Sequence, residues 1–197
     1  MRSKGLVFVY LFLMIASASL LFISCESQQA KVEMTEQEMI KRGEFLVMVG
    51  DCDACHSPKK FGPEGPMLDM SKRLSGHPEG SQLAPVDTSL IGPYVYFSSD
   101  LTAAIGPWGI TYSANLTPEM STGIGSWQPE MFINAMRTGK HLGVKEGRPI
   151  LPPMPWENLN RLSDEDLKAI FAYLKSMPAI KNKVPDPLPP NMIPVKQ

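Results

Sequence analysis

The sequence is poor in the side chains that most often carry catalysis or bind metal ions. Its 197 residues include three histidines and three cysteines. Three scattered histidines support no Ser/His/Asp catalytic arrangement, and no glycine-rich phosphate-binding loop is present. The formal net charge is −1, without the basic patch that a nucleic-acid partner requires. These absences argue against hydrolases of the triad type, nucleotide-binding proteins and nucleic-acid-binding proteins.

The first 25 residues have the form of a targeting segment. Arg2 and Lys4 precede an uncharged apolar run over residues 6–22, and Ser24-Cys25 follows it. A small residue directly before a cysteine resembles a bacterial lipobox, which predicts a lipoprotein signal peptide over residues 1–24 and lipidation of Cys25. Two alternatives stay open. The run approaches the ~20 residues that cross a bilayer and could be an uncleaved anchor, or ordinary signal peptidase could cleave it. All three place the rest of the chain outside the cytoplasm.

The other two cysteines form one short motif, Cys52-Asp53-Ala54-Cys55-His56. C-x-x-C-H is typical of covalent haem attachment: both thiols add to the haem vinyl groups, and the adjacent imidazole becomes the proximal iron ligand. A thioredoxin-like pair should accompany a βαβ pattern, and a zinc site needs further ligands at suitable spacing. Neither is visible, so Cys52, Cys55 and His56 are predicted to hold one haem c.

The remaining pattern predicts a mainly α-helical domain with long irregular connections. Residues 25–35 read as a tether, and Thr35 with Glu38 forms a capping box for a helix over about 36–49. Residues 57–126 are loop-rich, with possible short strands at 94–97 and 110–112. Further helices are predicted over 127–138, capped by Ser126, and after Ser163 up to Pro178. The domain is expected to span residues 36–178. A proline-rich tail over 179–197 should lie along the surface without a core of its own.

A second iron ligand is predicted at Met154. It lies in Leu151-Pro152-Pro153-Met154-Pro155-Trp156, where prolines limit the freedom of the backbone. A methionine thioether favours reduced iron and raises the reduction potential, as suits an electron carrier. Met177 is the next candidate. His77 or His141 would instead give a bis-histidine haem of lower potential.

Several segments together resemble class I cytochromes c, and especially the cytochrome subunits of periplasmic alcohol, aldehyde and molybdenum-hydroxylase dehydrogenases. The matching segments are GDCDACH at 50–56, GITYSANLTP at 109–118, TGIGSW at 122–127, LPPMPW at 151–156, LSDED at 162–166 and AYL at 172–174. The resemblance implies a cytochrome c fold of three to five helices around one covalent haem, with His56 and Met154 as the axial pair. It also implies that the first and last helices cross near Gly43. Such subunits commonly carry several haem domains, whereas this chain has one C-x-x-C-H.

The predicted function is single-electron transfer outside the cytoplasm, as partner or subunit of a periplasmic dehydrogenase or respiratory complex. The expected partners are redox proteins, together with a membrane reached through the lipid on Cys25, at the periplasmic face or in the outer membrane. The protein itself is not expected to be an enzyme. The alternatives are a peroxidase-like haem enzyme or a haem-based sensor, each of which needs a displaceable sixth ligand.

Overall fold

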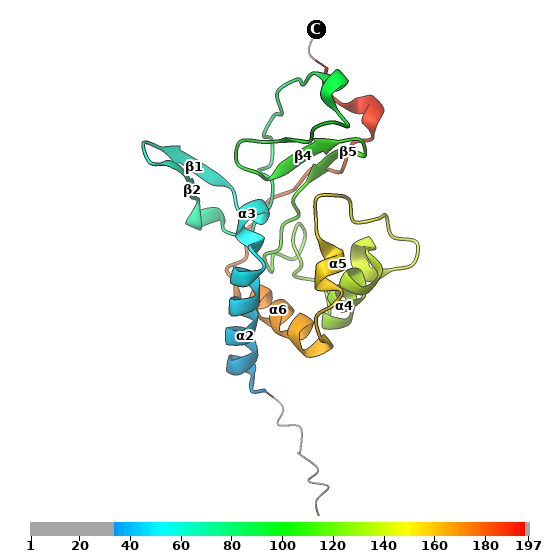
Figure 1. Ribbon diagram of the computed structural model, residues 1–197. Coiled ribbons are helices and arrows are strands. Elements are labelled where there is room, and N and C mark those ends of the chain that lie inside the picture. The colour runs from blue at the N-terminus through cyan, green and yellow to red at the C-terminus, as the bar shows by residue number, and fades with distance from the viewer. Residues whose placement is uncertain (1–33, 196–197) are drawn as a thin grey trace, which may run out of the picture. The chain divides into compact units, whose positions relative to one another are not determined.

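The computed structural model describes residues 34–195, and the predicted signal peptide with Cys25 lies outside them (Figure 1). The described part contains five α-helices, several short strands and four 3₁₀ turns. The α-helices are α2 (Glu36–Val49), α3 (Cys52–His56), α4 (Pro129–Thr138), α5 (Trp156–Leu159) and α6 (Asp164–Ser176). Among these residues no helix is both long enough and apolar enough to cross a bilayer.

Helix α2 begins at the predicted capping box. The Thr35 hydroxyl accepts from the Glu38 backbone N–H at 3.3 Å, and the Glu38 carboxylate accepts from the Thr35 N–H at 2.9 Å. Together these bonds satisfy N–H groups that have no partner within the helix. The predicted bounds of this helix are confirmed.

Helices α2 and α6 cross at Gly43, as expected. A Cβ atom on Gly43 would lie 1.9 Å from the Ala169 carbonyl oxygen and 2.7 Å from the Tyr173 Cβ. Only a residue without a side chain lets the two backbones approach this closely. The crossing lies beside the main apolar core, where Val47 of α2 and Leu167 and Leu174 of α6 are almost completely buried.

Helix α4 starts later than the sequence predicts. Its N-cap is Gln128 and not Ser126, and Pro129 occupies the first turn. Proline is favoured there because its fixed φ suits the first turn and no N–H is needed. The C-terminal prediction holds, since Gly139 ends the helix in the left-handed conformation with φ of 63°. Ser163 caps α6 as predicted, accepting from the Asp166 N–H at 3.0 Å.

The long connection after α3 contains more strand than the sequence suggests. An antiparallel hairpin of β1 (Lys59–Gly62) and β2 (Gly65–Leu68) projects from the end of α3 (Figure 1). A three-stranded antiparallel sheet follows, in the order β3 (Tyr96–Phe97), β4 (Ala103–Gly106) and β5 (Gly109–Tyr112). The two predicted strands correspond to β3 and β5. The hairpin and β4 were not predicted, because they lack the alternating pattern of a half-buried strand.

The C-terminal tail is more closely packed than predicted. Leu188 exchanges backbone hydrogen bonds with Ile110 of β5, at 2.8 and 3.1 Å. Ile193 is buried with Ile105 and Ile110 in a second, smaller apolar cluster. The expectation that the tail only lies along the surface is therefore wrong in part. The tail covers apolar side chains of the small sheet, which the strands alone would leave exposed.

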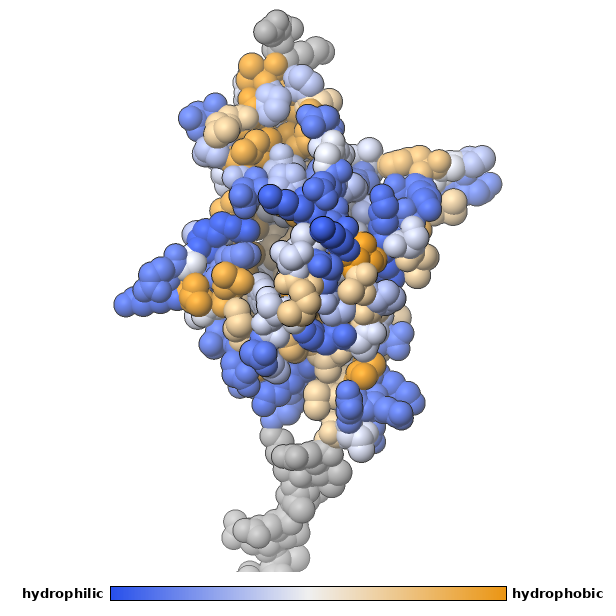
Figure 2. Space-filling view, turned by 180° about the vertical axis from the view of Figure 1, so that it is seen from behind, coloured by the Kyte–Doolittle hydropathy of each residue, from blue (hydrophilic) through white to orange (hydrophobic). Residues whose placement is uncertain are grey.

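Apolar side chains remain exposed around that second cluster. Figure 2 shows them gathered next to the C-terminal end of the described chain. The exposed apolar residues of this part are Leu90, Tyr94, Val95, Met192 and Val195.

Candidate haem-attachment site

The C-x-x-C-H motif forms a short helix of its own. Asp51 has φ of 49°, a left-handed conformation that turns the chain sharply between α2 and α3. Cys52 and Cys55 stand three residues apart on α3, so their side chains lie on neighbouring positions of one helix face. They form no disulfide with each other. Two reduced thiols on one face are what covalent attachment to two vinyl groups requires.

The surroundings keep both thiols protonated. Burial, reinforced by Asp53 and Asp51, raises the pKa of Cys52 to about 11. Burial also raises the pKa of Cys55, although Lys59 acts in the opposite direction. Within residues 34–195, no group of three or more His, Cys, Asp or Glu side chains is placed to hold a metal ion.

His56 is buried, and its ring has a defined orientation. Its Nδ1 lies 2.8 Å from the Ala114 carbonyl oxygen, to which it donates as Nδ1–H in the neutral imidazole. The proton is then on Nδ1, and Nε2 carries the lone pair. Burial lowers the pKa of His56, which favours this neutral form. A hydrogen bond of this kind fixes ring orientation and raises the basicity of a metal-ligating imidazole.

Ala114 is held in place by the segment around it. Ser113 O accepts from the His77 N–H at 2.9 Å, and Leu116 N donates to the Leu74 carbonyl at 2.9 Å. A Cβ on Gly76 would lie within 2.4 Å of the Ser113 oxygen. The acceptor for His56 therefore lies on a backbone packed tightly against residues 74–77.

Met154 lies at the edge of the main core, in the loop before α5. It is half-buried and packs against the same apolar cluster as Cys52, so the structure associates both residues with one core. A hollow of about 300 Å³ lies beside it, lined by residues 150 and 152–157. The loop is held by Met154 N–H donating to Leu151 O at 3.3 Å and Trp156 N–H donating to Met154 O at 3.0 Å.

The other candidate ligands have different surroundings. Met177 is the C-cap of α6 and also packs against the main cluster. His77 is buried away from that cluster, with Nδ1 2.8 Å from the Thr102 hydroxyl and its ring 4.9 Å from that of Tyr112. His141 lies at the edge of the Trp127 ring, 6.2 Å between centroids.

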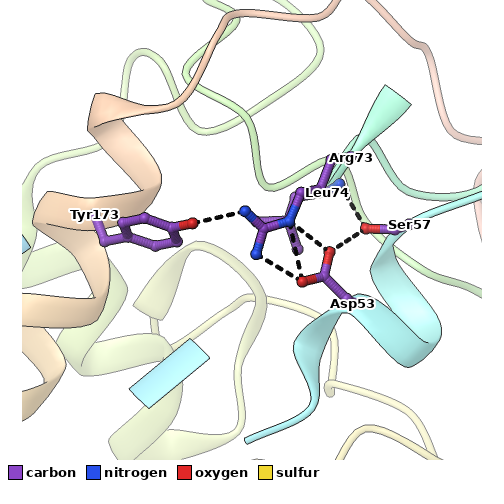
Figure 3. Close-up of polar contacts among 5 residues, drawn as sticks. All are labelled: Asp53, Ser57, Arg73, Leu74 and Tyr173. Atoms are coloured by element: carbon purple, nitrogen blue, oxygen red, sulfur yellow. Dashed lines mark hydrogen bonds and ion pairs between the residues drawn. The ribbon is translucent and has the colours of Figure 1, made fainter. Parts of the chain in front are cut away.

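A polar cluster beside the motif was missed at the level of sequence. Asp53, between the two cysteines, accepts from both Arg73 and Ser57, and Arg73 also reaches Tyr173 of α6 (Figure 3). Burial alone raises the pKa of the Asp53 carboxyl, but the hydrogen bonds from Arg73 and Ser57 outweigh it and leave the pKa lowered. No sequence pattern connects residues 53, 73 and 173, because the fold brings them together.

The residues present fit a covalent haem. The two thiols are free and adjacent, and the imidazole beside them has its proton fixed on the nitrogen that faces Ala114. A thioether borders the same apolar core. Two thiols, an imidazole and a thioether are the donors that a c-type haem would use.

Comparison with known proteins agrees with a c-type cytochrome. The family model for cytochrome c matches residues 40–178, and the chain belongs to the cytochrome c family. It is 32% identical over 141 residues to the gluconate 2-dehydrogenase cytochrome c subunit of Pantoea cypripedii, covering 72% of this chain and 24% of that protein. It is 32% identical over 154 residues to the fructose dehydrogenase cytochrome subunit of Gluconobacter japonicus, covering 75% and 24%.

A third relative is the cytochrome c subunit of the quinone alcohol dehydrogenase of Gluconobacter oxydans, 28% identical over 160 residues. That match covers 80% of this chain and 26% of the relative. The chain thus spans about a quarter of the length of these three relatives. Membership of the family implies haem c as the cofactor.

Proposed function

We propose that this protein is a monohaem c-type cytochrome that carries single electrons outside the cytoplasm. The observation that carries the proposal is the His56–Ala114 hydrogen bond beside two free cysteines. It leaves Nε2 as the ligand atom and holds it at a fixed angle. Haem c would supply the one-electron chemistry, and the chain's residues would hold it and set its potential.

In this proposal each site residue has one role. Cys52 and Cys55 would form the two thioether bonds to the haem. His56 is the proximal ligand. Met154 is the sixth ligand, in a loop whose prolines restrict its movement and beside an apolar core that favours a weakly polar sulfur ligand. With His56 and Met154 both bound to the iron, no coordination position would be left for a substrate.

The test combines haem staining with carbon monoxide binding. After acid–acetone extraction the denatured protein should keep its haem on a gel, which separates covalent from non-covalent haem. The reduced native protein should bind carbon monoxide poorly at neutral pH. Ready binding would favour the alternative, a haem enzyme or sensor with a displaceable sixth ligand.

The proposed partners follow from the relatives, which are cytochrome subunits of gluconate, fructose and alcohol dehydrogenases. This chain is proposed to accept electrons from a dehydrogenase of this general kind, or to pass them to a second cytochrome. Stopped-flow absorbance with a reduced soluble c-type cytochrome should show rapid single-electron exchange. Sustained peroxidase or dehydrogenase turnover by the intact protein would contradict the carrier role.

The proposed organisation is a lipoprotein signal peptide at 1–24, a tether at 25–35, a cytochrome domain at 36–178 and a tail at 179–197. Lipidation of Cys25 would hold the domain at the periplasmic face of a membrane or at the outer membrane. A diacylglycerol anchor suffices for this, at ~0.8 kcal/mol per buried CH₂. Cys25→Ala should abolish acyl labelling, and labelling that persists would disprove the lipobox.

A further inference from the structure

Arg73 joins three parts of the fold through its guanidinium group (Figure 3). Its Nη2 lies 2.7 Å from Asp53 Oδ2 and its Nε lies 3.0 Å from Asp53 Oδ1, a two-pronged ion pair with the haem-attachment helix α3. Its Nη1 donates to the Tyr173 hydroxyl of α6 at 2.7 Å. Paired hydrogen bonds of this kind fix geometry as well as charge.

A second set of bonds closes the same cluster from the other side. The Ser57 hydroxyl donates to Asp53 Oδ1 at 2.6 Å and accepts from the Leu74 N–H at 2.8 Å. The next contact along is the Gly76 N–H, which donates to the His56 carbonyl at 2.8 Å. Residues 73–76 therefore hydrogen-bond to α3 and its C-cap, at Asp53, His56 and Ser57.

The cluster lies beside the close crossing of α2 and α6. Tyr173 lies where α6 crosses α2, so close that a Cβ on Gly43 would be 2.7 Å from its own Cβ. Side chains of Arg73 and Asp53 are 21% and 17% exposed, so water screens their interaction only in part. Removing one member of a part-buried pair leaves the other charge poorly solvated and uncompensated, so the charge of each residue is felt most when its partner is removed.

We propose that Arg73 is a positioning residue that acts through Asp53, holding α3 against α6 and cancelling the carboxylate charge beside the haem, so that this ion pair sets the reduction potential. The inference rests on the proposed function, since it requires a haem at Cys52 and Cys55. Asp53 lies next to Cys52 in the chain, so its charge is close to the iron wherever the haem lies.

The sign of the effect follows from electrostatics. Oxidised iron carries one more positive charge than reduced iron. A carboxylate without its counterion stabilises the oxidised state, and a guanidinium without its counterion stabilises the reduced state. Removing either member of the pair should therefore move the potential in opposite directions, which simple loss of packing would not do.

The experiment is an equilibrium redox titration of Arg73→Gln, Asp53→Asn and the double variant. At a fixed applied potential, Arg73→Gln should raise the ratio of oxidised to reduced protein by on the order of fivefold. Asp53→Asn should lower it by a similar factor. The double variant restores neutrality and should return close to the wild-type ratio.

The matched control is a second Arg–Asp pair that also ends on α6. Arg42 Nε lies 2.8 Å from Asp166 Oδ1, and Arg42 is seven residues before the end of α2 at Val49, about 10 Å along the helix from the turn that leads to Cys52. Arg42→Gln and Asp166→Asn make the same charge changes and should leave the potential unchanged. If these variants shift the potential as much as those at Arg73 and Asp53 do, the shift depends only on the net charge of the protein, and the proposal is overturned.

Arg73→Lys separates position from charge. It keeps the positive charge but loses the planar fork, so the potential should stay near the wild-type value while resistance to urea falls. If Arg73→Gln does not accumulate as folded protein, the reduction potentials of Asp53→Asn and Arg73→Lys are compared instead. A higher potential in Asp53→Asn supports the proposal, and equal potentials overturn it.

Failure of the two proposals can be told apart. A wild-type protein that retains no haem after acid–acetone extraction would end the proposed function, and this inference with it. A wild-type protein with covalent haem and a methionine band, whose Arg73→Gln and Asp53→Asn potentials shift in the same direction or not at all, would overturn this inference alone.

Discussion

The two predicted iron ligands lie in surroundings of opposite character. His56 is 9% exposed, donates to Ala114 O, and is the last residue of α3, which Arg73, Ser57 and Gly76 contact by hydrogen bonds. Met154 is half-buried in a proline-rich loop beside an open hollow. Its backbone bonds are local, to residues within three positions along the chain.

The two predicted ligands are held in place by different means. Hydrogen bonds from distant segments fix the His56 side, so its geometry depends on the whole tertiary structure. The Met154 side depends on the stiffness of its own loop, since proline limits backbone freedom without long-range bonds. Changes on the His56 side should therefore damage the protein, whereas changes at Met154 should alter the cofactor's properties and leave the fold intact.

The largest effect is expected at His56 itself. His56→Ala removes the buried proximal ligand and leaves the Ala114 carbonyl without its donor, so the six-coordinate visible spectrum should disappear. Absorption spectroscopy of the reduced protein measures this. His141→Gln is the control and should keep the wild-type spectrum, and an unchanged spectrum in His56→Ala would remove His56 from the iron.

The next effect is expected at the helix crossing that supports the His56 side. Gly43→Ala places a methyl group against the Ala169 carbonyl and should lower the free energy of unfolding by about 3 kcal/mol or more. Urea unfolding followed by circular dichroism measures it. Gly62→Ala in the exposed hairpin, where the nearest atom is the flexible Met67 Cε at 3.4 Å, should have little effect. Equal losses in both variants would contradict the close crossing.

Met154→Ala tests the other side of the comparison. It should abolish the weak sulfur-to-iron absorption band, lower the potential and admit carbon monoxide, because the ligand that favours reduced iron is gone. Stability should fall by only about 1 kcal/mol, since the side chain is half-buried. Met120→Ala, 66% exposed, is the control. A band that survives Met154→Ala and is lost in Met177→Ala would transfer the role to Met177.

The smallest effect is expected from Glu119, in the segment that also carries Ala114. Hydrogen bonds from Thr122 and Ser121 lower its pKa to about 2. A carboxyl whose pKa is lower in the folded state stabilises the fold above its unfolded pKa, and the contribution is lost as pH falls. Glu119→Gln should therefore be less stable than wild type above about pH 4.5, and the gap should close towards pH 2.

Thermal unfolding at a series of pH values measures this gap. Ser121→Ala removes the hydroxyl that donates to Glu119 but keeps the backbone N–H, so it should reproduce part of the change. A gap between Glu119→Gln and wild type that is constant from pH 6 to pH 2 would show that the carboxylate's charge is not what matters.

Much of this protein could be predicted from local sequence. The Thr35 and Ser163 caps, the Gly139 helix end and strands β3 and β5 depend on residues within a few positions of one another. The close crossing of the first and last helices at Gly43 was expected from the family resemblance, and a glycine there allows it. The errors came where two local signals competed, as at Ser126 and Gln128, or where segments distant in the chain pack together, as the tail does when Leu188 pairs with Ile110.

The sequence by itself predicted the chemistry of the site, because the two cysteines and the histidine of the predicted haem motif lie within five consecutive residues. It also determined the family, through short segments in a fixed order. Only the tertiary structure decided how that chemistry is held. Ala114 became the partner of His56, and Arg73 the partner of Asp53 and Tyr173, across separations of 58, 20 and 100 residues. Hydrogen bonds and ion pairs act over a few ångströms, so such partners exist only once packing has brought the segments together.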